Sequence, residues 1–289
     1  MIIVNCPLFH DEMKKKGVYE YPLYKSYGFF RLRIGRLFRK IHLNFFNNLN
    51  TEYFSQKEQT IIVFDNGIID AKEVLSFIAK KNLGKRLIFY YWNPVERSVN
   101  PSKIPARYEK WSYSPKDCDK YGMKYNSTFF FDSLVPLKKE CKYDVFFAGK
   151  DKGRKKDLLK LKRIFDSYGL KNRFYITASH PRFQRKGFDK AISYNDLMKM
   201  TNESRCILDY YFYPDAGLSL RAMEGVFLNK KIITNNSSYK QYDFYNKSNV
   251  FILGEDDLDT IVEFVCSEVN VVDKRIVFQY RFENWEKIF

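Results

Sequence analysis

Residues 206–234, CILDYYFYPDAGLSLRAMEGVFLNKKIIT, contain the pattern that decides the fold. The stretch begins with an apolar run, Cys206 to Tyr210, and continues through a glycine-led amphipathic segment, Leu218 to Leu228. It ends in a second apolar run, Lys231 to Thr234. Short continuous apolar runs are typical of strands that are buried on both faces, as in parallel sheets. The stretch therefore predicts a strand, a helix and a second, parallel strand.

The same alternation extends along the rest of the chain. Other apolar runs predict strands at residues 1–5, 60–65, 87–92, 111–114, 143–149, 173–177 and 250–253, and helical periodicity predicts helices at 71–80, 153–168, 194–201 and 256–267. Between the two series, Val135 to Lys139 is a polar connector. The pattern predicts an α/β fold with two Rossmann-like domains, residues 1–138 and 139–289.

The composition is typical of a folded cytosolic protein. The chain has 289 residues, of which 45% are hydrophobic, which excludes an intrinsically disordered chain. No apolar run reaches the roughly 18 residues that a membrane span needs, and the first residues lack the basic start of a secretory signal. The five cysteines are dispersed, without a Cys-x-x-Cys pair. This spacing argues against a disulfide framework or a zinc site, and we expect reduced thiols.

The net charge indicates an anionic partner but does not identify it. The chain carries 50 Lys and Arg against 34 Asp and Glu, a formal charge of +16. Such a surface attracts phosphate-rich ligands, anionic lipid and nucleic acid alike. A second interpretation is that much of this charge is solvated surface without a partner.

Two predicted strand-to-helix turns combine glycine with polar side chains. The first runs from Phe146 to Arg154 and contains Gly149, Lys150 and Arg154. Parallel sheets bind ligands beyond the carboxyl ends of their strands, where glycine permits close approach and cations neutralise an anion. The turn has neither a GxxxxGK[ST] nor a GxGxxG motif, and an ordinary turn followed by a solvated basic helix is the alternative.

The second turn lies within the opening stretch. Gly217 precedes the predicted helix, Ser219 and the helix N-terminus offer hydrogen-bond donors, and Glu224 follows within two turns. A carboxylate there could accept two hydrogen bonds from a ribose, although an exposed Glu224 on a plain amphipathic helix is the alternative. The next predicted strand ends in polar residues at Asn235.

Residues 217–235 together resemble the donor-site block of GT-B-type glycosyltransferases. The segments 111–117, 120–125, 144–154 and 280–285 extend the likeness to bacterial glycosyltransferases of capsular, exopolysaccharide and lipopolysaccharide biosynthesis. The resemblance covers about residues 60 to 289. It implies two Rossmann-like domains that face a cleft, with an acceptor-side first domain and a second domain that binds the sugar nucleotide.

The resemblance also implies roles for individual residues. Glu224 would hold the nucleotide ribose; the residues expected at the diphosphate are Gly149, Lys150, Arg154, Gly217, Ser219, Leu220, Arg221 and Asn235. Many retaining members of the family carry a second Glu eight residues before the first, where this chain has Ala216 beside Asp215, so the stereochemical outcome stays open. No DxD motif stands where a metal-dependent enzyme would need one. We therefore expect metal-independent chemistry without a cofactor, in which cations and a helix dipole stabilise the leaving diphosphate.

An inverting transferase also needs a general base for the acceptor hydroxyl. His10 follows the first predicted strand, and an imidazole suits this role; a surface histidine in a loop is the alternative. Asp65, at the end of another strand, is the second candidate, and it could equally be a turn former.

Residues 29–46 have helical periodicity, with an apolar stripe beside several arginines. The stripe is either core or a basic amphipathic surface that docks on anionic lipid. We expect a cytoplasmic glycosyltransferase, peripheral at the inner face of the cell membrane, that uses a nucleotide-sugar donor and a surface-polysaccharide or lipid-linked glycan acceptor, and not nucleic acid. The alternatives are a basic nucleic-acid-binding protein and a catalytically inactive scaffold of the same fold.

Overall fold

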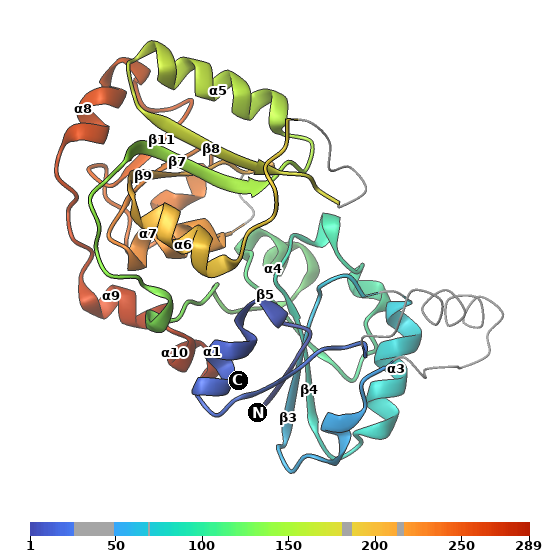
Figure 1. Ribbon diagram of the computed structural model, residues 1–289. Helices are drawn as coiled ribbons and strands as arrows, with labels where there is room; N and C mark the ends of the chain where they lie inside the picture. Colours follow the sequence, from blue (N-terminus) through green and yellow to red (C-terminus); the bar gives the residue numbers. More distant parts are fainter. Residues whose placement is uncertain (26–48, 69, 181–186, 213–216) are drawn as a thin grey trace. The chain divides into compact units, whose positions relative to one another are not determined.

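The computed structural model describes residues 1–25, 49–68, 70–180, 187–212 and 217–289. The chain forms two compact units, Met1–Asn126 (the first unit) and Ser127–Phe289 (the second unit), as Figure 1 shows. The predicted amphipathic segment 29–46 lies outside the described residues. The boundary between the units and the predicted boundary after residue 138 both fall in the connector between strands β6 and β7.

The first unit is built on a parallel six-stranded sheet. Its strand order is β2 (Tyr19–Tyr21), β1 (Ile2–Val4), β3 (Thr60–Phe64), β4 (Arg86–Tyr91), β5 (Glu109–Ser112) and β6 (Lys124–Tyr125). The α-helices described here are α1 (His10–Lys15), α3 (Ala71–Lys81) and α4 (Pro115–Tyr121). The central strands β1, β3 and β4 are almost entirely buried, which explains why they appear as continuous apolar runs in the sequence.

Local sequence signals explain the helices of the first unit. Val74, Leu75 and Ile78 form the buried face of α3 against the sheet. At the start of α4, the Ser114 side chain accepts a hydrogen bond from the Asp117 amide, and Gly122 ends the helix in the left-handed conformation. The apolar period and the caps together therefore set the bounds of these helices.

The second unit contains a parallel five-stranded sheet. The strand order is β11 (Val250–Ile252), β10 (Lys231–Thr234), β9 (Ser204–Asp209), β7 (Tyr143–Lys150) and β8 (Asn172–Thr177). Helices α5 (Lys155–Ser167) and α8 (Ile261–Cys266) cover one face, and α6 (Tyr194–Asn202) and α7 (Leu220–Phe227) cover the other (Figure 1). Two short helices, α9 (Lys274–Gln279) and α10 (Phe282–Glu286), follow near the C-terminus.

An aromatic cluster joins the two ends of the second unit. Phe129 and Phe131 pack against Phe282, and the Trp285 ring lies 4.5 Å from that of Phe129. The four side chains are nearly inaccessible to solvent. Burial of large aromatic surfaces is the main stabilising contribution here, at about 25 cal/mol per Å² of apolar area. The cluster explains why the segment after Asn126 belongs with the second unit.

The structure confirms the strand and helix pattern of the opening stretch. Helix α7 runs between β9 and β10, which pair in parallel. Gly225 allows α7 to pack closely on the sheet, since a Cβ atom there would lie 2.5 Å from the Ile232 side chain. The sequence did not predict β2, β6, α1, α9 and α10, because these elements are short and lack a clear period.

Candidate functional site

Most of the predicted site residues lie at the carboxyl ends of strands, in the loops that follow them or in the first turn of the next helix. In each unit the first strand, β1 or β7, pairs with the second strand on one side and with the third on the other. The connections that follow two such neighbouring strands run in opposite directions, and the place between the strands is called a switch point. Ligands bind in the crevice between the two connections. The switch points between β7 and β9 and between β1 and β3 are therefore the expected ligand positions.

Arg154 spans the switch point of the second unit. Its Nη1 donates a hydrogen bond to the carbonyl oxygen of Tyr210, which follows β9, and its Nη2 donates to the carbonyl oxygen of Lys150 at 3.4 Å. The guanidinium carbon lies 5.1 Å from the centre of the Phe147 ring. The loops after β7 and β9 are thus held together by a cation, at the point where an anion is expected.

Gly149 makes room for this guanidinium. A Cβ atom at Gly149 would lie 3.0 Å from Arg154 Nη2 and 3.2 Å from Phe147 Cζ. Lys150, at the end of β7, is exposed. The three residues predicted in this turn are therefore neighbours, and the glycine serves the placement of the arginine.

Ser219 organises the entrance of α7. Its hydroxyl accepts hydrogen bonds from the amides of Arg221 and Ala222, at 2.9 and 3.3 Å. The same hydroxyl donates to Asp209 Oδ2 at 2.8 Å. Gly217, two residues earlier, has a φ of +79°, which favours glycine. The entrance of α7, including the half-buried Leu220, is therefore held at the carboxyl edge of β9.

Asp209 is a residue of this edge that the sequence analysis missed. It is 4% exposed and accepts a second hydrogen bond from the buried Tyr239 hydroxyl at 2.6 Å. Burial raises the pKa of its carboxyl, against the lowering effect of these hydrogen bonds. An acidic residue at the end of an otherwise apolar strand was the signal that could have identified it.

Asn235 holds the loop after β9 from the neighbouring strand. Its Oδ1 accepts a hydrogen bond from the Tyr211 amide at 2.7 Å, and its Nδ2 donates to the Tyr211 carbonyl oxygen at 3.0 Å. Both groups of the side chain thus bind protein backbone. Asn235 lies at the predicted edge, and its contacts are those of a residue that shapes the site.

Glu224 lies deeper than the other residues, between α7 and α6. It is fully buried, its Oε1 accepts a hydrogen bond from the Tyr194 hydroxyl at 2.8 Å, and its Oε2 forms an ion pair with Arg221. Burial raises the pKa of Glu224 to about 7, and Arg221 and Tyr194 act in the opposite direction. The carboxylate expected to hold a ribose therefore has one oxygen in a hydrogen bond with Tyr194 and the other in an ion pair with Arg221.

His10 is paired with a carboxylate in the first unit. The imidazole Nδ1 lies 2.7 Å from Oε2 of Glu20, which is on β2, and the other carboxylate oxygen accepts a hydrogen bond from the Cys6 amide at 3.0 Å. The Glu20 side chain is 2% exposed, whereas that of His10 is 49% exposed. If the carboxylate is ionised, Nδ1 is the donor, and Nε2 of a neutral imidazole keeps a lone pair. The sequence analysis missed Glu20.

The switch point of the first unit is bridged by two amides. Asn5 Nδ2 donates to the carbonyl oxygens of Phe64 and Asn66, at 3.1 and 2.6 Å, and Asn66 Nδ2 donates to the Asn5 carbonyl oxygen at 2.8 Å. Asn5 has a φ of 73°, a conformation that asparagine tolerates better than most residues. The loops after β1 and β3 are thus tied together by neutral groups.

Asp65 anchors the loop after β4. Its carboxylate accepts hydrogen bonds from the Trp92 amide at 3.0 Å, the Asn93 amide at 3.3 Å and Asn93 Nδ2 at 3.2 Å. It is 3% exposed, and burial raises the pKa of its carboxyl to about 6. These contacts give Asp65 a structural role, whatever its part in the chemistry.

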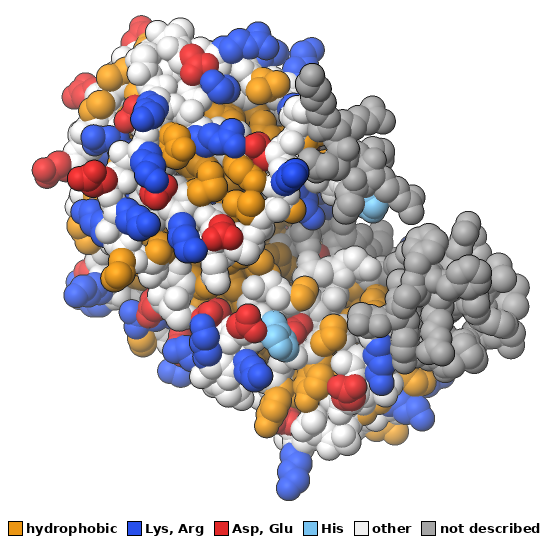
Figure 2. Space-filling view, in the orientation of Figure 1, with side chains coloured by type: hydrophobic (Ala, Val, Ile, Leu, Met, Phe, Trp, Pro, Cys, Tyr) orange, Lys and Arg blue, Asp and Glu red, His pale blue; other side chains and the backbone are white. Residues whose placement is uncertain are grey.

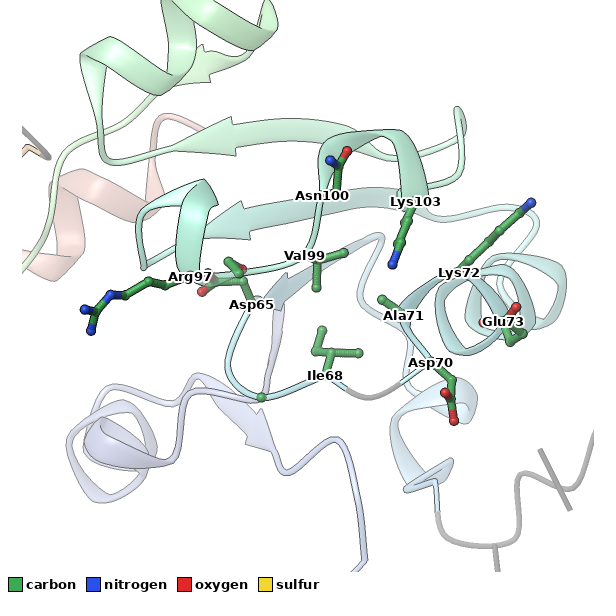
Figure 3. A pocket seen from close by; sticks show the side chains of 12 residues that line it. Asp65, Ile68, Asp70, Ala71, Lys72, Glu73, Arg97, Val99, Asn100 and Lys103 are labelled. Carbon is green, nitrogen blue, oxygen red and sulfur yellow. The ribbon is translucent and has the colours of Figure 1, made fainter. Parts of the chain in front are cut away.

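A pocket of about 470 Å³ opens beside Asp65 at the same edge. The loop after β3 and the first turn of α3 line one side, and residues 97–103 line the other (Figure 3). Ile68 and Val99 contribute apolar wall, Lys103 points its amino group toward Ala71, and Arg97 points away. A mixed polar and apolar lining suits a hydroxyl-rich ligand with an apolar ring face.

The surface charge of the second unit is dispersed on the face that Figure 2 shows. On the face that Figure 2 shows, lysine and arginine side chains lie among acidic and apolar ones and form no continuous stripe. Nucleic-acid-binding domains typically cluster such residues along one face. The nucleic-acid-binding alternative is therefore not favoured.

Among the described residues, no helix combines the length and the apolar character that a membrane span requires.

The fold is similar to those of solved glycosyltransferases. No protein-family model matches the chain, and no curated protein matches it in sequence. The structure is similar to that of the DNA-modifying enzyme β-glucosyltransferase, studied with and without uridine diphosphoglucose, with a TM-score of 0.55 and 13% identity over 99% of this chain and 97% of that one. Sucrose-phosphate synthase from Thermosynechococcus elongatus has a TM-score of 0.56 and 10% identity over 88% and 77%.

The likeness confirms the predicted fold class: two Rossmann-like α/β domains, as in GT-B glycosyltransferases. At this level of identity it establishes the fold, and the activity is a separate inference. The predicted roles of the site residues remain predictions.

Proposed function

We propose that the protein is a glycosyltransferase that moves a sugar from a nucleotide-sugar donor to a glycan acceptor. The observation that carries the proposal is Arg154 at the switch point of the second unit, bound to the carbonyl oxygen of Tyr210 next to Asp209, which holds the serine cap of α7. Cations and oriented amides at this place suit a diphosphate, and the fold is one on which sugar transfer is known. In this proposal Arg154, Lys150 and Arg221 stabilise the leaving diphosphate, without a metal ion or a cofactor.

The first unit supplies the base in this proposal. Glu20 orients the imidazole of His10 and stabilises the imidazolium that forms when Nε2 removes the proton of the acceptor hydroxyl. The deprotonated oxygen then attacks the anomeric carbon of the donor sugar while the bond to the diphosphate breaks. Asp65 is the weaker candidate, because its carboxylate already accepts three hydrogen bonds.

The pocket beside Asp65 is a candidate acceptor site, since its mixed lining suits a sugar ring. We propose a surface-polysaccharide or lipid-linked glycan as the acceptor, as in capsule or lipopolysaccharide synthesis, with the enzyme in the cytoplasm and peripheral at the membrane. The resemblance of residues 217–235 to such enzymes supports this assignment.

A panel of sugar nucleotides tests the proposal. The protein is incubated with UDP-, GDP- and CMP-sugars, with and without glycan acceptors, and products are identified by mass. We expect one donor to be consumed faster when its acceptor is present. Binding without turnover for any acceptor would favour an inactive scaffold. Thermal stabilisation by single-stranded DNA alone, with a steep salt dependence, would favour the nucleic-acid-binding alternative.

A further inference from the structure

The contacts of Glu224 conflict with a direct contact to the donor ribose. Both hydroxyls of a ribose would need the carboxylate oxygens that Tyr194 and Arg221 already engage. The carboxylate is fully buried where α7 meets Tyr194 of α6, so a ribose could not reach it in this arrangement of the side chains. The structure therefore favours another role for this residue.

Arg221 lies at the N-terminal end of α7, where a phosphate ligand would be expected. It follows the cap residue Ser219 on the first turn of α7, and Asp209 holds that cap at the carboxyl edge of β9. The Arg221 side chain is 15% exposed, whereas that of Glu224 is 0% exposed. The ion pair with Glu224 uses Nη1, and a guanidinium has five N–H donors in a planar fork.

We propose that Glu224 is a positioning residue that acts through Arg221. Its buried carboxylate orients the guanidinium toward the diphosphate of the donor, and the Tyr194 hydroxyl orients the carboxylate from the side of α6. This inference rests on the proposed function, because it names how the same donor site recognises phosphate and not ribose.

The physical reason is the cost of ordering a long side chain. Arginine loses much of its rotamer entropy when it is held in one geometry. A buried carboxylate three residues along the helix removes that cost before the ligand arrives. Removal of the carboxylate would leave the guanidinium free to turn away, so that diphosphate binding weakens while nucleoside contacts stay intact.

Three ligands separate the two roles of Glu224. UDP, UMP and 2′,3′-dideoxy-UDP are titrated against the wild type and Glu224→Gln by calorimetry. We expect Glu224→Gln to weaken UDP binding about tenfold and to remove most of the preference for UDP over UMP. The ratio of the UDP and dideoxy-UDP affinities should stay the same. If that ratio falls to about one in the variant, Glu224 contacts the ribose and the inference is wrong.

Further variants test whether Glu224 and Tyr194 act through Arg221, and one of them is a control. Arg221→Lys combined with Glu224→Gln should bind UDP no more weakly than Arg221→Lys alone, because the two residues act together. Tyr194→Phe should weaken UDP binding about threefold. Tyr168→Phe is the matched control, since it removes a tyrosine–carboxylate hydrogen bond to Asp259 elsewhere in the second unit, and it should leave UDP binding unchanged.

Additive losses in the double variant, or an equal loss from both tyrosine variants, would overturn the inference. Failure of the wild type to bind any of the UDP, GDP and CMP probes would instead remove the proposed function, and this inference with it. The two failures are therefore distinguishable by the wild-type titration alone.

Discussion

The two units share a strand order, but different side chains tie their loops together. In each, the first strand lies between the second and the third, and a side chain after the first strand ties the diverging loops together. In the first unit that side chain is the neutral Asn5, bound to the carbonyl oxygens of Phe64 and Asn66. In the second unit it is Arg154, bound to the carbonyl oxygen of Tyr210.

The buried acids at the third strand extend the comparison. Asp65 follows β3, and Asp209 ends β9; both have raised pKa values because they are buried. Asp65 anchors a backbone loop, whereas Asp209 holds the hydroxyls of Ser219 and Tyr239. The same topology leaves an imidazole exposed in the first unit and an exposed lysine at the carboxyl edge of the second, and in the proposed function these edges serve proton removal and diphosphate departure.

The largest effect should come from the imidazole of the first unit. His10→Ala should lower kcat about 1000-fold with little change in the donor KM, since general-base catalysis contributes typically 10²- to 10⁴-fold. Glu20→Gln should lower kcat about tenfold, because the imidazole loses its orienting charge. Steady-state kinetics with saturating donor measure both. Added imidazole should partly restore His10→Ala; an unchanged kcat in that variant would leave the first edge without a base at His10.

The next effect contrasts the two loop-bridging residues directly. Arg154→Ala should lower turnover about 100-fold and the melting temperature by only a few degrees, because the guanidinium is proposed to meet the diphosphate. Asn5→Ala should do the reverse: a loss of about 1–3 kcal/mol in the free energy of unfolding with normal turnover per folded molecule. Denaturation and single-turnover kinetics on both variants make the comparison. Equal losses of turnover and stability in Arg154→Ala would give it a purely structural role.

In the second unit, the sequence predicted where the strands end better than it predicted which side chains contact one another there. Apolar runs that end at Gly149 and Asn235 mark strand ends, so the position of the edge followed from burial alone. Helical periodicity predicted α6, which the Ser193 side chain caps, but nothing local showed that Tyr194 would reach Glu224, thirty residues later. Contacts between helices depend on packing, which a single period does not encode.

The pairing of His10 with Glu20 could not be predicted from the sequence for a similar reason. Glu20 lies on β2, a strand of three residues whose ends are exposed or half-buried, so that it shows no apolar run. Asp11 and Glu12 are closer to His10 in the sequence than Glu20 is, yet Glu12 pairs with Lys15. A glutamate between two tyrosines was the available signal, and it gains meaning only from the parallel pairing of β2 with β1.

The pH dependence of stability tests the anchoring role of Asp65. Its folded-state pKa of about 6 is above the ordinary value of 3.8, so the stability that it contributes is present below 3.8 and is lost as the pH rises through 6. Relative to Asp65→Asn, the wild type should lose about 1 kcal/mol of unfolding free energy between pH 5 and pH 8. Urea denaturation at several pH values measures this difference. A difference independent of pH would show that Asp65 keeps an ordinary pKa, and retained turnover in Asp65→Asn would exclude it as the base.

The smallest effect tests whether Gly149 serves the placement of Arg154. Gly149→Ala introduces a Cβ atom 3.0 Å from Arg154 Nη2, and the guanidinium must move by a few tenths of an ångström. We expect turnover to fall about fivefold, mainly through a higher donor KM, with a stability change below about 1 kcal/mol. Gly84→Ala is the matched control, because a Cβ atom there meets nothing within 4 Å. The decisive comparison is Gly149→Ala in the Arg154→Ala background: if the glycine acts through the arginine, the second substitution adds nothing, and a further fivefold loss would mean that the backbone of Gly149 itself approaches the donor.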